Sequence, residues 1–239
     1  MNLIGRRVLN LALRLRLSRR GLSPAARANL YALNGLSTRA RAAEQSFVVV
    51  DLETTGLNPY RDRVVSVGAF RVAGGGVRLG DYFSELVNPG RDIPSESIKV
   101  HAVTPAMIAA ARPAWEVFED FLDWLAGDIL VAHHALFDLV FLNMVMKAQH
   151  GFKIQNLVVD TVLMCRTALI EPDPYGERRG AKRCSLDGLA ERFNINVPER
   201  HTALGDAMAT ALLLLRLLDE LERQGWSTLG DLVRVAGVL

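Results

Sequence analysis

Two carboxylates stand close together at Asp51 and Glu53, where an apolar run that begins at Phe47 comes to an end. The run is short and rich in β-branched residues, which predicts a buried strand. Alternate side chains of a strand share one face, so both carboxylates point the same way. Like charges this close repel unless a cation lies between them. The pair therefore indicates either a cation site or a solvated turn, and Thr54-Thr55-Gly56 supplies the turn.

Two further acidic positions stand near predicted strand and helix ends. Asp138 follows the apolar run at 128–132 and opens a helical pattern, a place where the helix dipole alone also favours an acid. His201 and Asp206 would lie about 140° apart around a helix axis, so they can share one ligand only if His201 precedes the helix. Pro198 predicts a helix boundary at that point. Together these groups indicate one ligand-binding edge of a sheet.

The surrounding elements would place these groups on a mixed sheet. Apolar and β-branched runs predict strands at 47–51, 63–72, 81–87, 128–132 and 157–160. Helical patterns predict helices at 105–111, 114–126, 136–149, 161–170, 185–193 and 201–223, with a Pro-, Gly- and Arg-rich loop at 171–183. Short turns join the first three strands into an antiparallel meander, and later strands alternate with helices. We therefore expect an α/β fold whose sheet is covered by helices.

The three clusters resemble the motifs of the DEDDh exonucleases, the DnaQ-like family that includes the proofreading ε subunit of DNA polymerase III. D-x-E-T-x-G corresponds to Asp51–Gly56, A-H-N-x-x-F-D to Ala132–Asp138, and H-x-x-x-x-D to His201–Asp206. Further landmarks match at Leu86–Pro89, Val100–Thr104, Asp160-Thr161 and Ser185–Leu189. The resemblance runs from about Phe47 to Arg223. His134 replaces the family's usual Asn, and Ala102 replaces the usual Gly of an H-G-I-T turn.

This resemblance implies an RNase H-like fold, with a five-stranded mixed sheet of three antiparallel and then two parallel strands. It implies 3′→5′ exonuclease activity on nucleic-acid 3′ ends, with single-stranded or frayed DNA as the expected substrate and nucleoside 5′-monophosphates as products. Two Mg²⁺ or Mn²⁺ ions would be held by Asp51, Glu53, Asp138 and Asp206. His201 would be the general base, because an imidazole exchanges protons near neutral pH. The substrate contacts implied are Thr54, Thr55, Leu57, His101 and Phe137; Leu57 and Phe137 fit core packing almost equally well.

Charge is unevenly distributed along the chain. Residues 1–45 carry nine arginines and one acid, a net charge of +8, whereas the other 194 residues carry 19 basic and 25 acidic groups, a net charge of −6. Val8, Leu11 and Leu15 recur at helical spacing, which predicts a basic amphipathic helix within 1–22. Three interpretations of this arm stay open: a helix docked on the domain or a partner, an attachment to nucleic acid or an anionic membrane, and a cleaved targeting segment.

We expect three parts: the basic arm and a linker at 1–45, the exonuclease domain at 46–223, and a short helical segment at 224–239. No apolar run reaches the roughly 18 residues that cross a bilayer. Two cysteines, Cys165 and Cys184, are too few for a disulfide framework. These features predict a cytoplasmic protein with two free thiols. A nucleic-acid 3′ end is the expected substrate, and a DNA polymerase or another replication or repair protein is the expected partner.

Two other functions fit part of the pattern. Asp51-x-Glu53-x-Thr55 loosely matches the nucleophile loop of haloacid-dehalogenase-type phosphatases. That chemistry also needs a downstream lysine, of which the chain has only four, and it leaves His201 and Asp206 unexplained. The second alternative is a catalytically weak exonuclease-like module that binds a polymerase or nucleic acid. Such a module would tolerate the loss of a ligand, yet all five positions are present.

Overall fold

The computed structural model of the protein describes residues 3–17, 21–169 and 184–238. The strands are β1 (Phe47–Thr54), β2 (Val64–Ala73), β3 (Gly76–Asn88), β4 (Arg112–Pro113), β5 (Ile129–Ala132), β6 (Val158–Asp160) and β7 (Gly237–Val238). The helices are α1 (Leu3–Leu17), α2 (Pro24–Asn29), the short 3₁₀ helix η1 (Ala42–Glu44), α3 (Ser95–His101), α4 (Pro105–Ile108), α5 (Ala114–Leu125), α6 (Leu136–His150), α7 (Thr161–Leu169), α9 (Leu186–Arg192), α10 (Ala203–Arg223) and α11 (Leu229–Ala236). Across the described residues, no helix combines the length and the apolar character needed to cross a membrane.

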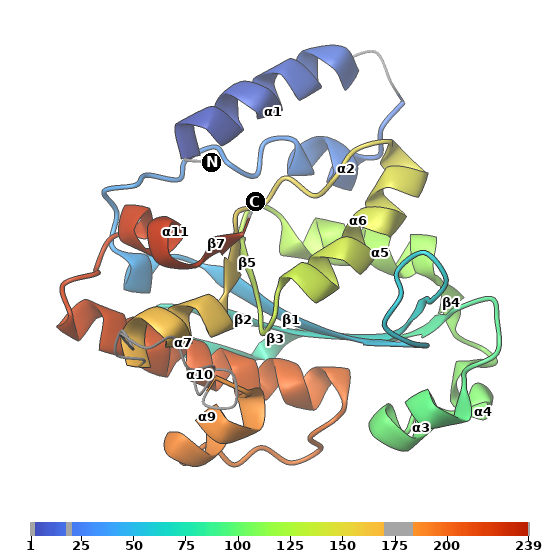
Figure 1. The fold of residues 1–239 in the computed structure, drawn as a ribbon. Helices are drawn as coiled ribbons and strands as arrows, with labels where there is room; N and C mark the ends of the chain where they lie inside the picture. Colours follow the sequence, from blue (N-terminus) through green and yellow to red (C-terminus); the bar gives the residue numbers. More distant parts are fainter. Residues whose placement is uncertain (1–2, 18–20, 170–183, 239) are drawn as a thin grey trace, which may run out of the picture.

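The sheet has the strand order β4-β3-β2-β1-β5-β6-β7 (Figure 1). β1, β2 and β3 form the predicted antiparallel meander, and β5 and β6 continue the sheet parallel to β1. The five expected strands are confirmed. The two-residue strands β4 and β7 extend the sheet at its edges, and they are too short to leave a periodic pattern in the sequence.

Alternating side chains of β1 pack into two separate hydrophobic cores. Val48, Val50 and Leu52 pack with α5 and α6, whereas Phe47 and Val49 pack with α7, α10 and α11. The helices therefore cover both faces of the sheet (Figure 1). This arrangement follows from the period of two along a strand, because a strand that is apolar at every position must be covered on both sides.

Several element boundaries differ from the sequence predictions. The seven-residue helix α3 was not predicted, and the helix expected at 105–111 is shorter and ends at Ile108. The expected loop at 171–183 and the last residue of the helix at 161–170 lie outside the described residues. The segment expected as a linker is fixed to the C-terminal part: Ala42 N–H donates to Ser227 and Leu229 N–H donates to Ala40, each at 2.8 Å.

The two cysteines form a disulfide between α7 and the residue before the N-cap of α9. The prediction of two free thiols is therefore wrong. Cys165 and Cys184 are both buried in the core between α7 and α10. A count of two cysteines argues against a disulfide framework, but it cannot exclude one bridge between segments that the fold brings together.

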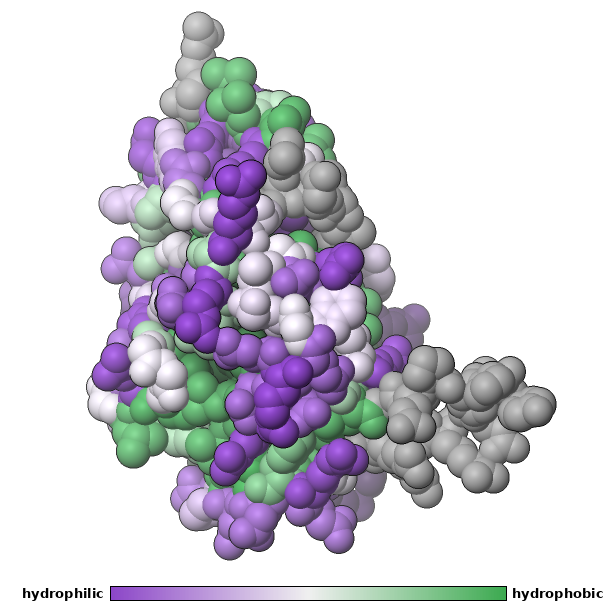
Figure 2. All heavy atoms as spheres, turned by 90° about the vertical axis from the view of Figure 1, so that its left-hand side faces the viewer, coloured by the Kyte–Doolittle hydropathy of each residue, from purple (hydrophilic) through white to green (hydrophobic). Residues whose placement is uncertain are grey.

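The N-terminal helix α1 docks through Arg6, Arg7 and Arg14, and its Leu13 and Leu17 pack against the core. Arg6 donates to the Asn156 carbonyl at 3.0 Å, and Arg14 donates to the Leu30 carbonyl at 2.7 Å while its guanidinium lies 4.1 Å from the ring centre of Tyr31. Other apolar residues of the helix point outward: Val8 is 64% exposed and Leu15 is 71% exposed. Apolar residues accordingly cover the upper end of the face shown in Figure 2, where α1 lies.

Candidate active site

The end of β1 presents its acids on one face of the sheet. Asp51 and Glu53 are half-buried and point toward α10, whereas Leu52 and Thr54 between and after them are buried. The carboxylates of Asp51, Glu53 and Asp206 each offer an oxygen within 4.8 Å of the others. Asp51 and Glu53 therefore share one face of β1, as their i, i+2 spacing predicted, and α10 supplies Asp206 as the third acid.

Gly68 lets α10 approach the sheet this closely, and Gly205 lets the turn before α10 pack against the start of the helix. A Cβ on Gly68 of β2 would lie 2.3 Å from the backbone of Ala203 and Leu204, at the first turn of α10. A Cβ on Gly205 would lie 2.1 Å from the Glu199 carbonyl oxygen. Neither glycine was among the predicted site residues. An isolated glycine inside a strand is the available signal, because it often marks a close backbone approach.

His201 lies in the turn that leads into α10. Thr202 is the N-cap of the helix and accepts a hydrogen bond from Gly205 N–H at 3.1 Å. His201 therefore precedes the helix, as its spacing from Asp206 required. Its backbone N–H donates to the Asp206 carboxylate at 3.1 Å, and its side chain is exposed. The turn holds the imidazole next to the acid cluster while leaving it open to solvent.

Asp138 reaches the same strand end from the opposite layer. It stands in the first turn of α6 and is buried, and its carboxylate accepts the Leu52 backbone N–H at 3.1 Å. β5 pairs with β1 only along Phe47–Val49. The N–H of Leu52 lies beyond that pairing, so the edge of β1 has a free donor that the carboxylate of Asp138 satisfies.

Asp160 holds the turn that carries Asp138. Its buried carboxylate accepts the backbone N–H groups of His134 and Ala135, both at 3.2 Å, and of Val162 at 2.8 Å. His134 has a φ of 63°, so the turn is left-handed at this residue. Asp160 was noted in the sequence only as a landmark of the family. The structure shows it as a residue that positions the start of α6.

Burial and mutual repulsion make ionisation of the four acids costly. Burial, and then the charges of Asp138 and Glu53, raise the pKa of Asp51 well above its usual range. Burial, with the Asp206 charge, raises the pKa of Glu53 to about 7. Burial raises the pKa of Asp138 to about 8, although its hydrogen bond from Leu52 opposes the shift. Burial also raises the pKa of Asp206, against the opposing charge of Arg200.

This donor set fits hard divalent cations. Clustered carboxylates with raised pKa values are stabilised in their charged form when a cation lies between them. Oxygen atoms are the ligands that Mg²⁺ and Mn²⁺ prefer. Asp51, Glu53, Asp138 and Asp206 would be the residues that hold such ions.

Arg200 is a further charged residue that sequence reasoning missed. Its guanidinium forms ion pairs with both Asp206 and Asp187; it lowers the pKa of Asp187 and opposes the rise that burial causes in the pKa of Asp206. Arg200 thereby connects the Ser185–Leu189 landmark to the acid cluster. The sequence signal was only its position next to His201, because an ion pair between residues 13 positions apart leaves no periodic pattern.

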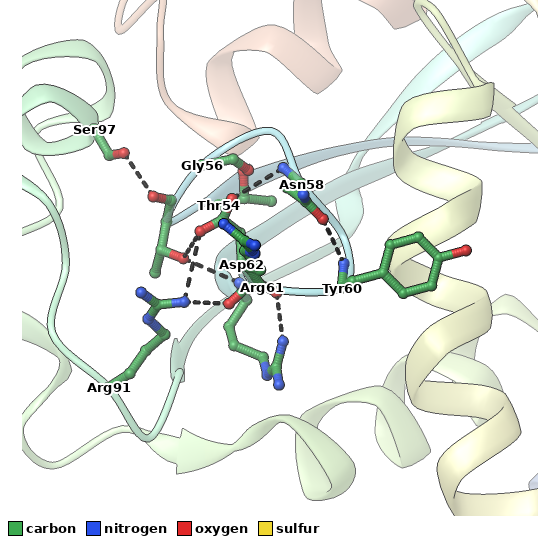
Figure 3. A network of polar contacts seen from close by, with 10 residues as sticks. Thr54, Gly56, Asn58, Tyr60, Arg61, Asp62, Arg91 and Ser97 are labelled. Carbon is green, nitrogen blue, oxygen red and sulfur yellow. Dashed lines mark hydrogen bonds and ion pairs between the residues drawn. The ribbon is translucent and has the colours of Figure 1, made fainter.

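The loop after β1 is fixed by its own polar contacts (Figure 3). The Thr54 hydroxyl donates to the Gly56 carbonyl at 2.7 Å, and the Thr55 hydroxyl donates to the Asp62 carboxylate at 3.2 Å. A Cβ on Gly56 would lie 2.5 Å from the same carboxylate. Both threonines are buried, so their hydroxyl groups shape the loop, and any substrate contact by this segment would come largely from its backbone.

The remaining predicted contact residues surround this loop. Leu57 is 83% exposed, which excludes ordinary core packing for its side chain. Phe137 is half-buried, and its ring centre lies 5.1 Å from that of Phe141. His101 is buried, which lowers its pKa, and its Nδ1 accepts the Val103 N–H at 3.0 Å. Its Nε2 has no hydrogen-bond partner within the described part of the chain.

Known proteins match this chain in sequence. The sequence profile of the RNase T exonuclease family matches residues 48–214, well over half of the chain. A DNA polymerase III subunit epsilon-like protein of Rhodobacter capsulatus is 44% identical over 77% of this chain, although the chain spans only 25% of that protein. The DNA polymerase III subunit epsilon of Aquifex aeolicus is 33% identical over 78% of this chain, which spans 87% of it. The chain spans only 12% of the Bacillus subtilis PolC-type polymerase, to which it is 34% identical.

Solved structures show the same fold. Exonuclease X in complex with 5′-overhanging duplex DNA aligns with a TM-score of 0.58 at 24% identity, over 78% of this chain and 97% of that one. The nuclease domain of 3′hExo, a DEDDh family member bound to rAMP, aligns with a TM-score of 0.61 at 16% identity, over 76% of this chain and 95% of that one. With its RNase H-like sheet and its match to the family profile over most of its length, the chain belongs to the RNase T exonuclease family.

Proposed function

We propose that the protein is a divalent-metal-dependent 3′→5′ exonuclease that removes nucleoside 5′-monophosphates from nucleic-acid 3′ ends, with DNA as its substrate. The observation that carries the proposal is the convergence of four acids from β1, α6 and α10 on one strand end, of which Asp138 is buried and the others are half-buried. The membership of the family supports the same activity.

Each residue of the cluster has a role in this proposal. Asp51, Glu53, Asp138 and Asp206 hold two Mg²⁺ or Mn²⁺ ions, which supply Lewis-acid stabilisation of the charge that develops at phosphorus and at the leaving 3′ oxygen. His201, exposed in the turn before α10, takes the proton of the attacking water at one of its ring nitrogens. Arg200 and the backbone N–H of His201 keep the Asp206 carboxylate in place.

The terminal nucleotide would lie against the loop after β1. The backbone of Thr54 and Thr55 contacts its sugar, and Leu57 and Phe137 flank its base. The exposure of Leu57 supports this role, because an isolated large apolar side chain at a loop tip gains little from the solvent. His101, at the end of α3, shapes the inner side of this nucleotide-binding site.

Digestion of a 3′-labelled single-stranded oligonucleotide with Mg²⁺ tests the proposal. We expect the wild type to release labelled nucleoside 5′-monophosphate, and Asp51→Asn and His201→Ala to lose most of this activity. Asp219→Asn is the matched control, since Asp219 is an exposed acid on the far part of α10. Equal digestion by the wild type and Asp51→Asn would contradict the assignment. It would favour a binding module that lacks catalysis.

We also propose that the outward face of α1 attaches the enzyme to an anionic membrane surface. Val8, Leu9, Leu11 and Leu15 are each more than half exposed, and Arg16 lies exposed beside them. The chain has no acidic residue before Glu44. An apolar face with the exposed cation Arg16 beside it fits the boundary between anionic headgroups and acyl chains, whereas a phosphate backbone alone would not cover the leucines.

Co-sedimentation of the full chain with vesicles tests this attachment. We expect binding to vesicles of phosphatidylglycerol and phosphatidylcholine, weaker binding to phosphatidylcholine alone, and loss of binding in Leu11→Glu/Leu15→Glu. Leu79→Glu is the control, because Leu79 is a similarly exposed leucine on β3. Unchanged vesicle binding in the double variant would overturn the proposal. So would a stable dimer that this variant dissociates, because the face would then be covered by a second copy.

A further inference from the structure

An apolar pocket of about 570 Å³ is lined in part by the loop after β1 and includes none of the four acids. α6 forms one wall with Phe141, Met144 and Val145, and the start of α5 forms another with Trp115. Pro59 and Pro89, in the loops that follow β1 and β3, close the remaining side. The pocket is therefore bounded by the same loop that carries the predicted contacts to the terminal nucleotide.

The pocket continues the surface on which the terminal base would lie. Phe137 and Phe141 are neighbours on one face of α6, and their ring centres are 5.1 Å apart. With a rise of 1.5 Å per residue, Met144 lies about 10 Å along the helix from Phe137. Stacked nucleotides are about 3.4 Å apart along a strand. A strand that follows α6 would thus bring the nucleotides next to the terminal one to the pocket.

The side chains around the pocket suit a nucleobase. Trp115 is 58% exposed, and Tyr60 on the neighbouring loop is 80% exposed. The ring of Tyr60 points away from the polar contacts that fix its loop (Figure 3). Large exposed aromatic side chains next to an apolar hollow are typical of surfaces on which bases stack.

Arg63 lines the pocket, and Arg61 and Arg91 are next in the chain to lining residues. Arg61 and Arg63 are exposed on the loop that contributes Pro59, and Arg91 lies opposite, 3.6 Å from Asp62. The Arg91 guanidinium also donates to the Arg61 carbonyl. This ion pair neutralises the one acid that lines the pocket, which leaves Arg61 and Arg63 to attract phosphate groups.

We infer that this pocket binds a nucleobase of the substrate strand upstream of the scissile bond. The inference rests on the proposed exonuclease function and extends it: the enzyme grips the strand as well as its terminal nucleotide. Stacking on Trp115 and the apolar wall of α6 holds any base, because every base has an apolar face. The pocket would therefore favour longer single strands over dinucleotides without selecting a sequence.

Two substrates of different length separate this pocket from the catalytic residues. The p-nitrophenyl ester of thymidine 5′-phosphate fills only the terminal position, whereas an eight-nucleotide DNA strand also reaches the pocket. We expect Trp115→Ala to raise KM for the eight-nucleotide strand about tenfold, the factor that corresponds to about 1.4 kcal/mol of lost stacking. We expect kcat on the strand to stay unchanged, and both constants for the ester to stay unchanged.

The conservative variant and a matched control make the result specific. Trp115→Phe keeps an aromatic face and should restore most of the wild-type KM for the strand. Tyr31→Ala removes a comparably exposed aromatic side chain beside α1 and should leave KM and kcat for both substrates unchanged.

Three outcomes would overturn the inference. An unchanged KM for the strand in Trp115→Ala would leave the pocket to another occupant, such as an apolar segment of a partner protein. An equal loss on both substrates would show a general structural effect. If the wild type hydrolyses neither substrate, the proposed exonuclease function fails and the pocket assignment fails with it. Normal hydrolysis of the ester together with an unaffected strand KM refutes the pocket alone.

Discussion

The acid cluster and the N-terminal helix are both assembled from segments far apart in the sequence, but different forces hold them. α10 contacts the sheet through backbone atoms that leave no room for a Cβ on Gly68. α1 is held by long arginine side chains that donate to carbonyl oxygens and by Leu13 and Leu17, whereas Val8, Leu9, Leu11 and Leu15 face outward. Close backbone contact fixes a position to within a fraction of an ångström, whereas a flexible arginine tolerates adjustment. The acid cluster should therefore be far more sensitive to substitution than the arm.

Gly68→Ala should show the largest effect. The added Cβ would lie 2.3 Å from backbone atoms of α10, so the helix and Asp206 must move away from β1. We expect a loss of more than about 4 kcal/mol of folding free energy or, where the variant folds, loss of nuclease activity. Denaturant unfolding and hydrolysis of the thymidine ester measure the two effects.

Gly80→Ala is the control for this substitution, because nothing lies within 4 Å of a Cβ at that exposed position. If Gly68→Ala is as stable and active as Gly80→Ala, close packing does not set the position of α10, and the contrast between the two regions fails.

Asp160→Ala should have the next largest effect. The substitution leaves three backbone N–H groups of the turn before α6 and of α7 without their acceptor. We expect a loss of about 2–4 kcal/mol, because unsatisfied buried donors are costly, together with lower activity as Asp138 shifts. Asp160→Asn keeps one acceptor oxygen, so its Tm should lie between that of Asp160→Ala and that of the wild type. Equal stability of all three proteins would show that the turn holds its shape without Asp160.

The pH dependence of metal stabilisation should be smaller but diagnostic. The folded-state pKa of Glu53 is raised to about 7 and that of Asp138 to about 8. A raised folded-state pKa means that the folded protein holds the protons of these acids more tightly than the unfolded chain does. The stability that this gives the metal-free protein is present at low pH and is lost as pH rises through about 7 to 8. We expect Mg²⁺ to raise Tm, relative to EDTA, by several degrees more at pH 8.5 than at pH 5.5.

Glu53→Gln removes one of these titrating groups, so the metal-free variant should lose less Tm between the two pH values than the wild type. The same Mg²⁺ effect at both pH values would argue that the four acids do not share a cation site.

The difference between the two regions also explains what could be predicted from the sequence. Asp51, Glu53 and Asp138 follow β-branched runs whose period predicts strands and places the acids at their ends. The direction in which α1 faces could not be predicted, because its spacing shows that one face is apolar but not which face the domain contacts. The role of Asp160 and the Cys165–Cys184 bridge depend on contacts between elements, which leave no local pattern. Among these missed features, only Gly68 left a signal in the sequence, because it is a glycine inside a strand.

Arg14→Ala should have the smallest effect. It removes the hydrogen bond to the Leu30 carbonyl and the contact with Tyr31, and we expect a loss of about 1 kcal/mol. Hydrolysis of the thymidine ester should stay unchanged, because α1 contributes no residue to the acid cluster. Faster proteolysis within residues 3–17 would report the loosened helix. Arg16→Ala is the control, since Arg16 lies exposed on the outer side. A large loss of activity in Arg14→Ala would show that the arm and the acid cluster are coupled, which would contradict the independence that we infer from their separate contacts.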